Sequence, residues 1–389
     1  MNSPAQSTFH ERYIPALDGI RGVAIIAVLL HHCRFLLNPA FPVERALVKT
    51  MELGWCGVVL FFVLSGFLIT GILLDTQTSP NFFSTFYARR FLRIFPLYYV
   101  SLAMAFFGSR VLHSLLGAAD PLAHVSPWWY LGYVQNFRPA SALMDPYLGP
   151  MWSLAVEEQF YLVWPLLVLL LNRRALTWLC AALIPFSFAV RFHYTGTPAG
   201  DLFVNTFTLA SLDALAAGAL LAIAIRNPAW RRRMAFLARP IAVAGLASFG
   251  LLAWRAGSLF EYAPGIQTWG ITALVVSFAM ITFVAATSKR GVTVGILQLS
   301  GLRFTGKISY GLYVLHPLVM ALAIPALGAV PATAAVDLAL NADKIVLVLL
   351  ACFAAAAASW FYFEKPILGL KKHFRYSEPA PLRRSAAAD

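Results

Sequence analysis

Charged side chains are scarce in this chain of 389 residues, because aspartate, glutamate, lysine and arginine together make up only 12% of it. Soluble domains carry roughly 25% charged residues. Hydrophobic residues reach 60% and the mean hydropathy is +0.71, so the composition argues against a soluble globular protein. It predicts an all-α, polytopic integral membrane protein instead.

Cysteines are also few, and their spacing carries no signal. No pair stands at the short intervals that are typical of metal sites or redox motifs, and we expect no metal site. The four cysteines lie far apart in or beside apolar segments, where we expect them to pack as small hydrophobic side chains. They are Cys33, Cys56, Cys180 and Cys352.

The sequence lacks a small-residue cleavage site after its first apolar stretch, an appended soluble domain and an internal repeat. We interpret the first stretch as an uncleaved membrane span rather than a signal peptide. A bilayer core about 30 Å thick needs about 20 apolar residues per helix, and about ten transmembrane helices are predicted on this basis. They run near 14–36, 54–74, 94–116, 151–171, 176–195, 205–225, 238–255, 267–287, 308–328 and 345–363.

The basic residues are distributed unevenly between the two sides of these spans. If the N-terminus is cytoplasmic, 21 of the 30 lysines and arginines fall in segments on the cytoplasmic side. The positive-inside rule therefore predicts that the N- and C-termini both face the cytoplasm. The same rule accounts for most of the net charge of +13, so we expect no nucleic-acid partner. The predicted outer loops hold only Arg45, Lys49, Arg138 and Lys344.

The first span carries ionisable residues that a purely structural helix would not keep. Eleven residues separate Arg21 from His32, which places them about 20° apart after three full turns and roughly 16 Å apart along the axis. Asp18 is close enough to Arg21 for an ion pair. Such side chains usually face a water-filled cavity, and an imidazole suits proton transfer. The alternative is that Asp18 and Arg21 anchor the helix at the headgroups and His32 caps its outer end.

Basic and acidic pairs stand at two further points. Arg90 and Arg93 are neighbours on one helix face, and paired guanidinium groups suit a phosphate-bearing ligand, although a topology signal explains them equally well. Glu157 and Glu158 point in different directions on a helix. We expect one to face a cavity and the other to cap the external helix N-terminus. Asp213 has no partner that the sequence assigns.

Other polar and aromatic residues can be interpreted either as structural or as functional. Ser309, Tyr310, Tyr313 and His316 form a polar stripe in the ninth span, although a lone buried histidine is as often structural. The aromatic cluster at 127–133 suits the headgroup level or the face of a sugar. The glycines of the second span favour close helix packing.

In these motifs the chain resembles the membrane acyltransferase-3 family, which includes bacterial O-acetyltransferases of lipopolysaccharide O-antigen and other surface glycans. The motifs follow one another over nearly the whole chain. They are 17–21 with His32, 61–66, Arg90 with Arg93, 152–154 with 157–161, 309–313 with 316–317, and 364–366. One position departs from the family pattern, which often has an arginine where Ser211 precedes Asp213.

The resemblance implies a multi-pass protein of the bacterial inner (cytoplasmic) membrane that uses cytoplasmic acyl-CoA, most of all acetyl-CoA, as co-substrate. The acyl group is expected to go to a hydroxyl of a glycan or lipid-linked sugar, such as O-antigen or exopolysaccharide. Residues 1–375 then form the acyltransferase-3-like transmembrane domain, and 376–389 a disordered cytoplasmic tail. Some members carry a further C-terminal esterase-like domain. This sequence ends soon after its tenth span, so we expect another protein to perform any such step.

The resemblance also implies roles for individual residues. Arg21 and His32 match the essential pair of the family, and Arg90 and Arg93 match the basic motif that is expected to contact coenzyme A. The remaining catalytic candidates are Asp18, Glu157 and Glu158. The candidates for substrate contact or support are Trp152, Ser153, Tyr161, Ser309, Tyr310, Tyr313 and His316.

We hypothesise that the pantetheine arm reaches from Arg90 and Arg93 toward His32. There His32 acts either as a nucleophile that accepts the acyl group or as a general base. The main rival is a transporter or flippase that uses the buried charges as a pathway. A third class is a non-catalytic partner in glycan export. The lipid bilayer is an expected partner, and the sequence does not indicate an oligomeric state.

Overall fold

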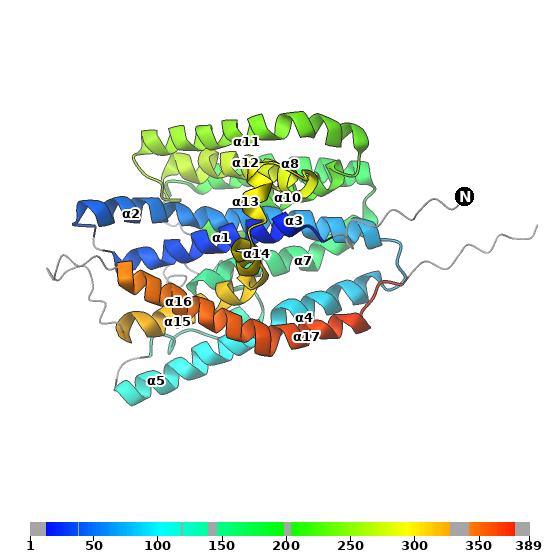
Figure 1. The fold of residues 1–389 in the computed structure, drawn as a ribbon. Coiled ribbons are helices and arrows are strands. Elements are labelled where there is room, and N and C mark those ends of the chain that lie inside the picture. Colours follow the sequence, from blue (N-terminus) through cyan, green and yellow to red (C-terminus); the bar gives the residue numbers. More distant parts are fainter. Residues whose placement is uncertain are drawn as a thin grey trace, which may run out of the picture.

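The protein is helical throughout the residues that the structure, a computed structural model, describes. These residues are 13–37, 39–117, 120–138, 145, 147–197, 204–326 and 342–377. No strand occurs within them, which confirms the predicted all-α class. Figure 1 shows most of the helices lying side by side along one direction, with α13 and α14 running across it.

Sixteen α-helices are defined in this part of the chain. They are α1 (Pro15–Cys33), α2 (Pro42–Glu52), α3 (Cys56–Thr76), α4 (Phe82–Ala103), α5 (Ser109–Leu116), α6 (Trp128–Leu131), α7 (Trp152–Leu170), α8 (Arg173–Tyr194), α10 (Thr208–Ala224), α11 (Pro228–Ala256), α12 (Ile271–Thr287), α13 (Val292–Leu297), α14 (Ser300–Lys307), α15 (Ser309–Ala326), α16 (Ala342–Ser359) and α17 (Lys365–Gly369).

Short 3-10 and π-helical segments connect or extend them. The 3-10 segments are η1 (Arg34–Leu36), η2 (Leu53–Trp55), η4 (Gln135–Phe137), η6 (Gly149–Met151) and η9 (Leu370–His373). The π-helical segments are η3 (Met104–Gly108), η7 (Ile266–Gly270) and η8 (Trp360–Glu364).

The number of membrane-spanning helices agrees with the sequence prediction. Among the described residues, 9 helices are long and apolar enough to cross a bilayer. A tenth is obtained when α14 and α15, which meet at a bend of 70°, are taken as one span. The last 12 residues of the predicted C-terminal tail, 378–389, lie outside the described residues.

Two spans begin earlier than the hydropathy pattern predicts. The helix predicted near 94–116 begins at Phe82, and the one predicted near 238–255 begins at Pro228. In the second case the Asn227 side chain accepts hydrogen bonds from the backbone N–H groups of Ala229 and Trp230, and so caps the helix. Hydropathy locates only the part of a helix that lies in hydrocarbon, and both helices extend beyond it.

Close backbone contacts hold the centre of the bundle together. A Cβ atom on Gly66 of α3 would lie 1.9 Å from the carbonyl oxygen of Leu215 on α10, and one on Gly218 would lie 2.0 Å from that of Val63. The two helices approach each other this closely because neither has a side chain there. The packing role predicted for the glycines of the second span is therefore confirmed.

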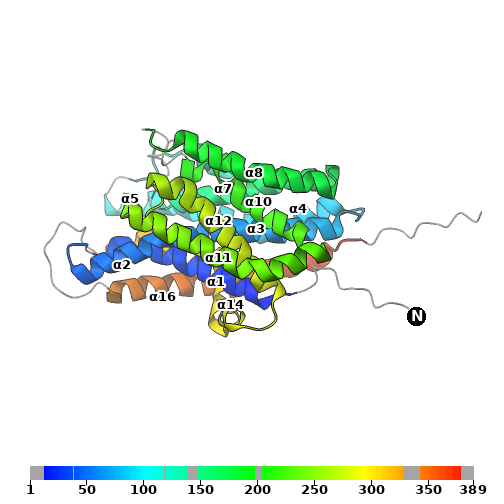
Figure 2. The same cartoon turned by 90° about the horizontal axis from the view of Figure 1, so that it is seen from above.

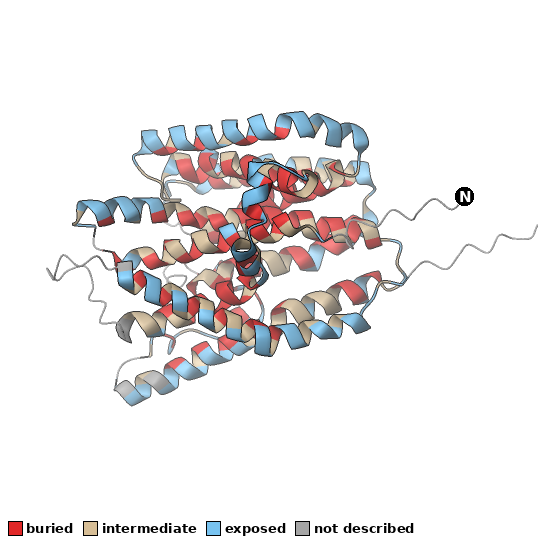
Figure 3. Cartoon of the chain, in the orientation of Figure 1, coloured by how far each residue is buried: buried red, intermediate tan, exposed pale blue. Residues whose placement is uncertain are grey.

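Burial is concentrated in the middle of the molecule. Figure 3 shows that buried residues gather along α1, α3 and α10, whereas α11 presents a mostly exposed surface. Many of the exposed residues are large and apolar, as expected of a surface that faces lipid. The helix α14 packs beside α1 on the opposite side of the molecule from α8 (Figures 1 and 2). The cysteines are free thiols, and Cys33, Cys180 and Cys352 are buried as predicted.

Candidate active site

Two cavities lie along the first helix, one beside each end of its polar stripe. The Arg21 cavity is lined by polar groups from α1, α3, α4, α7 and α15. They belong to Arg21, Ser65, Arg90, Arg93, Ser153, Glu157, Tyr161, Ser309, Tyr310 and Tyr313. The His32 cavity is lined by His31, His32, Trp55, Trp152, Arg191, Asn205, Ser211, Asp213, Glu261 and Tyr313, among others. Both cavities share Val58, Phe62 and Tyr313, which form the wall between them.

The Arg21 cavity is strongly cationic. Arg21 forms the ion pair predicted with Asp18, at 3.1 Å, and Asp18 also accepts a hydrogen bond of 2.8 Å from the Tyr13 hydroxyl. Arg90 and Arg93 make no ion pair within the part of the chain that the structure describes. The guanidinium of Arg90 instead lies over the Phe86 ring, 5.8 Å from its centroid, and over a tyrosine ring of α7.

A lysine that sequence reasoning missed adds to this charge. Lys371 of η9 lies close enough to Arg21, Arg90 and Arg93 to interact with all three electrostatically. Glu364 interacts with Arg93, and Glu157 interacts with Arg21 and Arg90. The Oε2 atom of Glu364 is buried without a hydrogen-bond partner among the described residues. A cationic surplus of this kind suits a ligand with several negative charges.

The two adjacent glutamates of α7 occupy different environments, but neither caps a helix. Glu157 lines the Arg21 cavity, and its Oε2 atom accepts a hydrogen bond of 3.1 Å from the Tyr161 hydroxyl, which is also bonded to Ser65. Glu158 does not line either cavity. The predicted capping role is wrong, because α7 begins at Trp152 and its first turn contains no acidic residue.

His32 has one ring nitrogen fixed by its own helix. Its Nδ1 atom lies 2.9 Å from the carbonyl oxygen of Val28, and because a carbonyl can only accept, Nδ1 carries the proton. The Nε2 atom of the neutral ring therefore has a free lone pair. A nitrogen in this state can accept a proton or attack a carbonyl carbon. The alternative that His32 merely caps the outer end does not explain why it lines a cavity.

Two further histidines surround His32. The ring of His316 on α15 lies 4.9 Å from it, centroid to centroid, in an edge-to-face arrangement, and the ring of His31 lies 5.3 Å away. His316 is fully buried, its Nδ1 atom bonds the Tyr313 carbonyl at 2.8 Å, and its Nε2 atom has no hydrogen-bond partner within the described part of the chain. His316 therefore supports His32 by packing and does not line either cavity itself.

Asp213 gains a partner that the sequence could not assign. The guanidinium of Arg191, near the end of α8, lies 2.6 Å from the Asp213 carboxylate, and both side chains are only 1% exposed. Arg191 also donates to the Thr272 hydroxyl at 2.9 Å and to the Ala210 carbonyl. The arginine that is absent two residues before Asp213 is thus supplied by a neighbouring helix.

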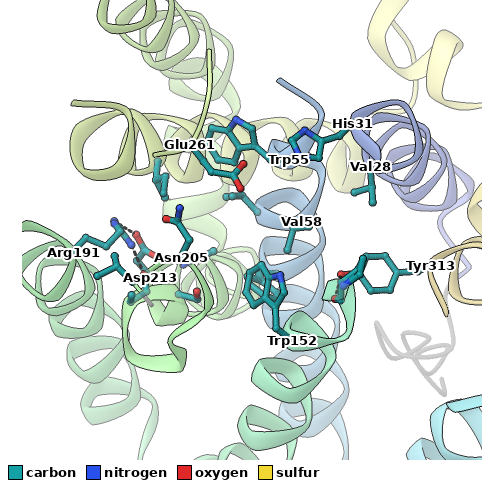
Figure 4. A pocket seen from close by; sticks show the side chains of 18 of the residues that line it. Val28, His31, Trp55, Val58, Trp152, Arg191, Asn205, Asp213, Glu261 and Tyr313 are labelled. Carbon is teal, nitrogen blue, oxygen red and sulfur yellow. Dashed lines mark hydrogen bonds and ion pairs between the residues drawn. The ribbon is translucent and has the colours of Figure 1, made fainter. Parts of the chain in front are cut away.

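Figure 4 shows how the His32 cavity is built. Arg191, Asp213 and Asn205 lie on one side of it, His31 and Tyr313 lie on the other, and Glu261 is beside Trp55 at the top of the view. Of these residues, sequence reasoning missed a role for His31, Trp55, Arg191, Asn205 and Glu261. The sequence does not indicate that these residues belong to one site, because helices and loops that are distant in the sequence bring them together.

The remaining predicted residues divide between the two cavities. Trp152 lines the His32 cavity, Ser153, Tyr161, Ser309 and Tyr310 line the Arg21 cavity, and Tyr313 lines both. The aromatic cluster at 127–133 lines neither. Tyr130 and Tyr133 of this cluster are buried, whereas Trp128 is 75% exposed.

The structure is thus a bundle of membrane helices with a cationic cavity and a histidine cavity on either side of a shared wall. The chain belongs to the acyltransferase-3 family, since the acyltransferase domain that characterises this family matches residues 14–364. No solved structure shows a significant match to the chain.

Among curated proteins, the chain is 29% identical over 379 residues to the peptidoglycan O-acetyltransferase OatA of Listeria monocytogenes, covering 92% of this chain and 56% of that protein. It is 29% identical over 338 residues to the putative peptidoglycan O-acetyltransferase YrhL of Bacillus subtilis, covering 82% and 50%. It is 26% identical over 327 residues to the O-acetyltransferase OatA of Staphylococcus aureus, covering 80% and 51%. The chain spans about half the length of these relatives.

Proposed function

We propose that the protein is a membrane O-acyltransferase that moves an acyl group, in the first place acetyl, from acyl-CoA to a hydroxyl of a cell-surface glycan. The observation that carries this proposal is the shared wall between the two cavities at Tyr313. It brings a site for a multiply charged donor next to a histidine with a free Nε2 atom. The names of the relatives support acyl transfer over other membrane functions.

The donor is acyl-CoA bound in the Arg21 cavity from the cytoplasmic side. Arg90 and Arg93 hold its phosphates, because neither guanidinium forms a direct ion pair within the described residues and guanidinium groups bind phosphate well. Lys371 adds to the same positive field. The positive-inside rule supports a cytoplasmic location for this end of the molecule.

The acceptor is a sugar hydroxyl that approaches His32 from the outer side. As general base, His32 Nε2 takes the hydroxyl proton while the oxygen bonds the thioester carbonyl carbon; the C–S bond then breaks and the proton passes to the thiolate. As nucleophile, Nε2 bonds the thioester carbonyl carbon and the C–S bond breaks to release the coenzyme A thiolate. The sugar oxygen then bonds the acyl carbon, the C–N bond to Nε2 breaks, and the hydroxyl proton passes to the thiolate. Peptidoglycan, exopolysaccharide and lipopolysaccharide O-antigen are the candidate acceptors.

Proteoliposomes that contain the purified chain and labelled acetyl-CoA test this proposal. We expect label to reach an added oligosaccharide, His32→Ala to abolish transfer, and the Arg90→Ala/Arg93→Ala variant to raise the KM for acetyl-CoA at least tenfold. Arg233→Ala, an exposed arginine of α11, is the matched control and should behave as wild type. Label that is trapped on the protein without acceptor, and lost in His32→Ala, would identify the nucleophilic route.

The second candidate is a transporter or flippase. Two cavities that face each other across a thin wall also suit a substrate that crosses the membrane by alternating access. The same proteoliposomes decide between the two functions: glycolipid translocation without consumption of acetyl-CoA would support the transporter and overturn the enzyme. A non-catalytic partner in glycan export predicts that Arg21→Ala and His32→Ala retain full function.

A further inference from the structure

Three polar atoms around the His32 cavity have no hydrogen-bond partner within the described residues, although they are buried. They are the Nδ2 atom of Asn205, the Oε2 atom of Glu261 and the Nε atom of Arg191. All three residues line this cavity. Buried polar groups in native proteins are nearly always paired, so three such atoms around one cavity indicate a site built for a polar ligand.

The neighbouring side chains fix the direction of the Asn205 amide. Gln267 donates from its Nε2 atom to the Asn205 carbonyl oxygen at 3.2 Å, and the Gln267 oxygen in turn accepts from the Thr195 hydroxyl at 2.7 Å. In this arrangement the NH₂ group of Asn205, a residue that lines the cavity, is a donor without a partner among the described residues. Glu261 is an acceptor when it is ionised, so the two residues together match a hydroxyl group, which both donates and accepts.

Aromatic side chains complete the lining. Trp152 lies at the start of α7 and is partly exposed, with its ring 6.1 Å from that of Phe62. Trp55 donates its indole N–H to the Leu259 carbonyl at 3.0 Å, which holds it against the cavity. An indole face offers the flat apolar surface on which the C–H face of a sugar ring stacks.

The charges around the cavity favour an uncharged ligand. The charge of Arg191 is compensated by Asp213 at 2.6 Å, and Glu261, once ionised above the pKa of about 7 to which burial raises it, would repel an anionic sugar. The Arg21 cavity has the opposite character, since three arginines and one glutamate line it. The polyanionic donor and a neutral acceptor are therefore separated by charge as well as by the wall between the cavities.

We propose that the His32 cavity is the binding site for an uncharged sugar unit of the acceptor, held by Asn205 and Glu261 and stacked on Trp152. This inference rests on the proposed function, because a sugar in this cavity would present a hydroxyl to His32, which lines the same cavity as Asn205. The site itself can be tested without any acyl transfer.

The test measures binding of chitotetraose, a neutral oligosaccharide, and of tetragalacturonate, its anionic counterpart, to the full chain in nanodiscs by isothermal titration calorimetry. We expect wild-type protein to bind chitotetraose and to bind tetragalacturonate at least tenfold more weakly. Asn205→Leu and Trp152→Ala should each weaken chitotetraose binding at least tenfold, and Trp152→Phe should recover part of the loss. Trp254→Ala, which removes an indole that is 78% exposed on α11, is the matched control and should leave binding unchanged.

A second measurement separates loss of the site from loss of the fold. Each variant should keep the wild-type affinity for acetyl-CoA, which binds in the other cavity. Unchanged chitotetraose binding in Asn205→Leu and Trp152→Ala, or equal binding of both oligosaccharides by the wild type, would overturn the inference and leave the proposed function intact. Chitotetraose binding by a wild-type protein that never consumes acetyl-CoA, with loss of that binding in Asn205→Leu and Trp152→Ala, would support the sugar site and overturn the enzyme.

Discussion

Arg191 and Asp213 form a buried ion pair in which each side chain compensates the charge of the other. Removing one member of such a pair costs about 3–5 kcal/mol, because the other charge remains buried and unpaired. We therefore expect Arg191→Ala to lower the melting temperature of the detergent-solubilised protein strongly. The double variant Arg191→Met/Asp213→Leu should recover most of the loss.

The exposed Arg255 of α11 provides the control for this experiment, since Arg255→Ala should change stability by no more than about 0.5 kcal/mol. If Arg191→Ala were as stable as Arg255→Ala, the pair would not contribute to the fold. A double variant with a melting temperature no higher than that of Arg191→Ala would show that polar contacts, such as the one to Thr272, contribute more to stability than the compensation of charge.

Glu261 makes stability depend on pH. Burial raises the pKa of this carboxyl to about 7, against the attraction of Arg34 and a hydrogen bond from Tyr262, which both lower it. Because the folded protein holds this proton more tightly than the unfolded chain, the contribution of Glu261 to stability is full at pH 4.5 and is lost as the pH rises to about 7.

Glu261→Gln removes this dependence. We expect the melting temperature of the variant, relative to wild type, to increase between pH 5 and pH 7.5 and then to stay constant. Gln298→Asn, which replaces one exposed amide by another, is the control, and its difference from wild type should stay constant with pH. A constant difference for Glu261→Gln over the whole range would contradict the raised pKa.

At the scale of helices, the contact between α3 and α10 is the most sensitive to side-chain size. A methyl group on Gly66 would meet the Leu215 carbonyl at 1.9 Å, and the backbones would have to move apart. Overpacking of this kind typically costs about 1–3 kcal/mol. We expect Gly66→Ala to lower the melting temperature, whereas Gly250→Ala, with no atom within 4 Å, should raise or preserve it. Equal melting temperatures for the two variants would show that the helices can separate freely.

The sequence predicted which helices exist better than where they begin. Hydropathy found the spans because length and apolar composition are local properties. It missed the first turns of α4 and α11, which begin at Phe82 and Pro228, since polar and basic residues can extend a helix beyond the hydrocarbon. The prediction that one glutamate of α7 caps the helix was wrong for a related reason. The position of a residue within a helix depends on where the helix begins, and α7 begins at Trp152, directly after η6.

The candidate site was predictable only where its residues share a helix. Asp18, Arg21 and His32 could be placed on one face from helical geometry alone, and the ion pair between Asp18 and Arg21 is confirmed. Arg191 and Asp213 are 22 residues apart on different helices, so their pairing depends on tertiary packing. No local pattern encodes a contact of this kind.

For the whole molecule, the orientation in the membrane stays a prediction from the distribution of basic residues. Single-cysteine variants in a cysteine-free background test it in intact cells with a membrane-impermeant maleimide. We expect a cysteine at Asp120 to react from outside and one at Ser377 to react only after lysis. The reverse pattern would place the Arg21 cavity on the outside and would contradict the proposed donor side.

The thin wall between the cavities also bears on the electrical behaviour of the molecule. Water that fills two cavities conducts, so a membrane potential falls mainly across the dry protein between them. Here that layer contains Val58, Phe62 and Tyr313. A proton that crosses it experiences nearly the whole voltage, which amounts to about 2.3 kcal/mol per 100 mV. An energised membrane would then act on any step that moves charge through this wall.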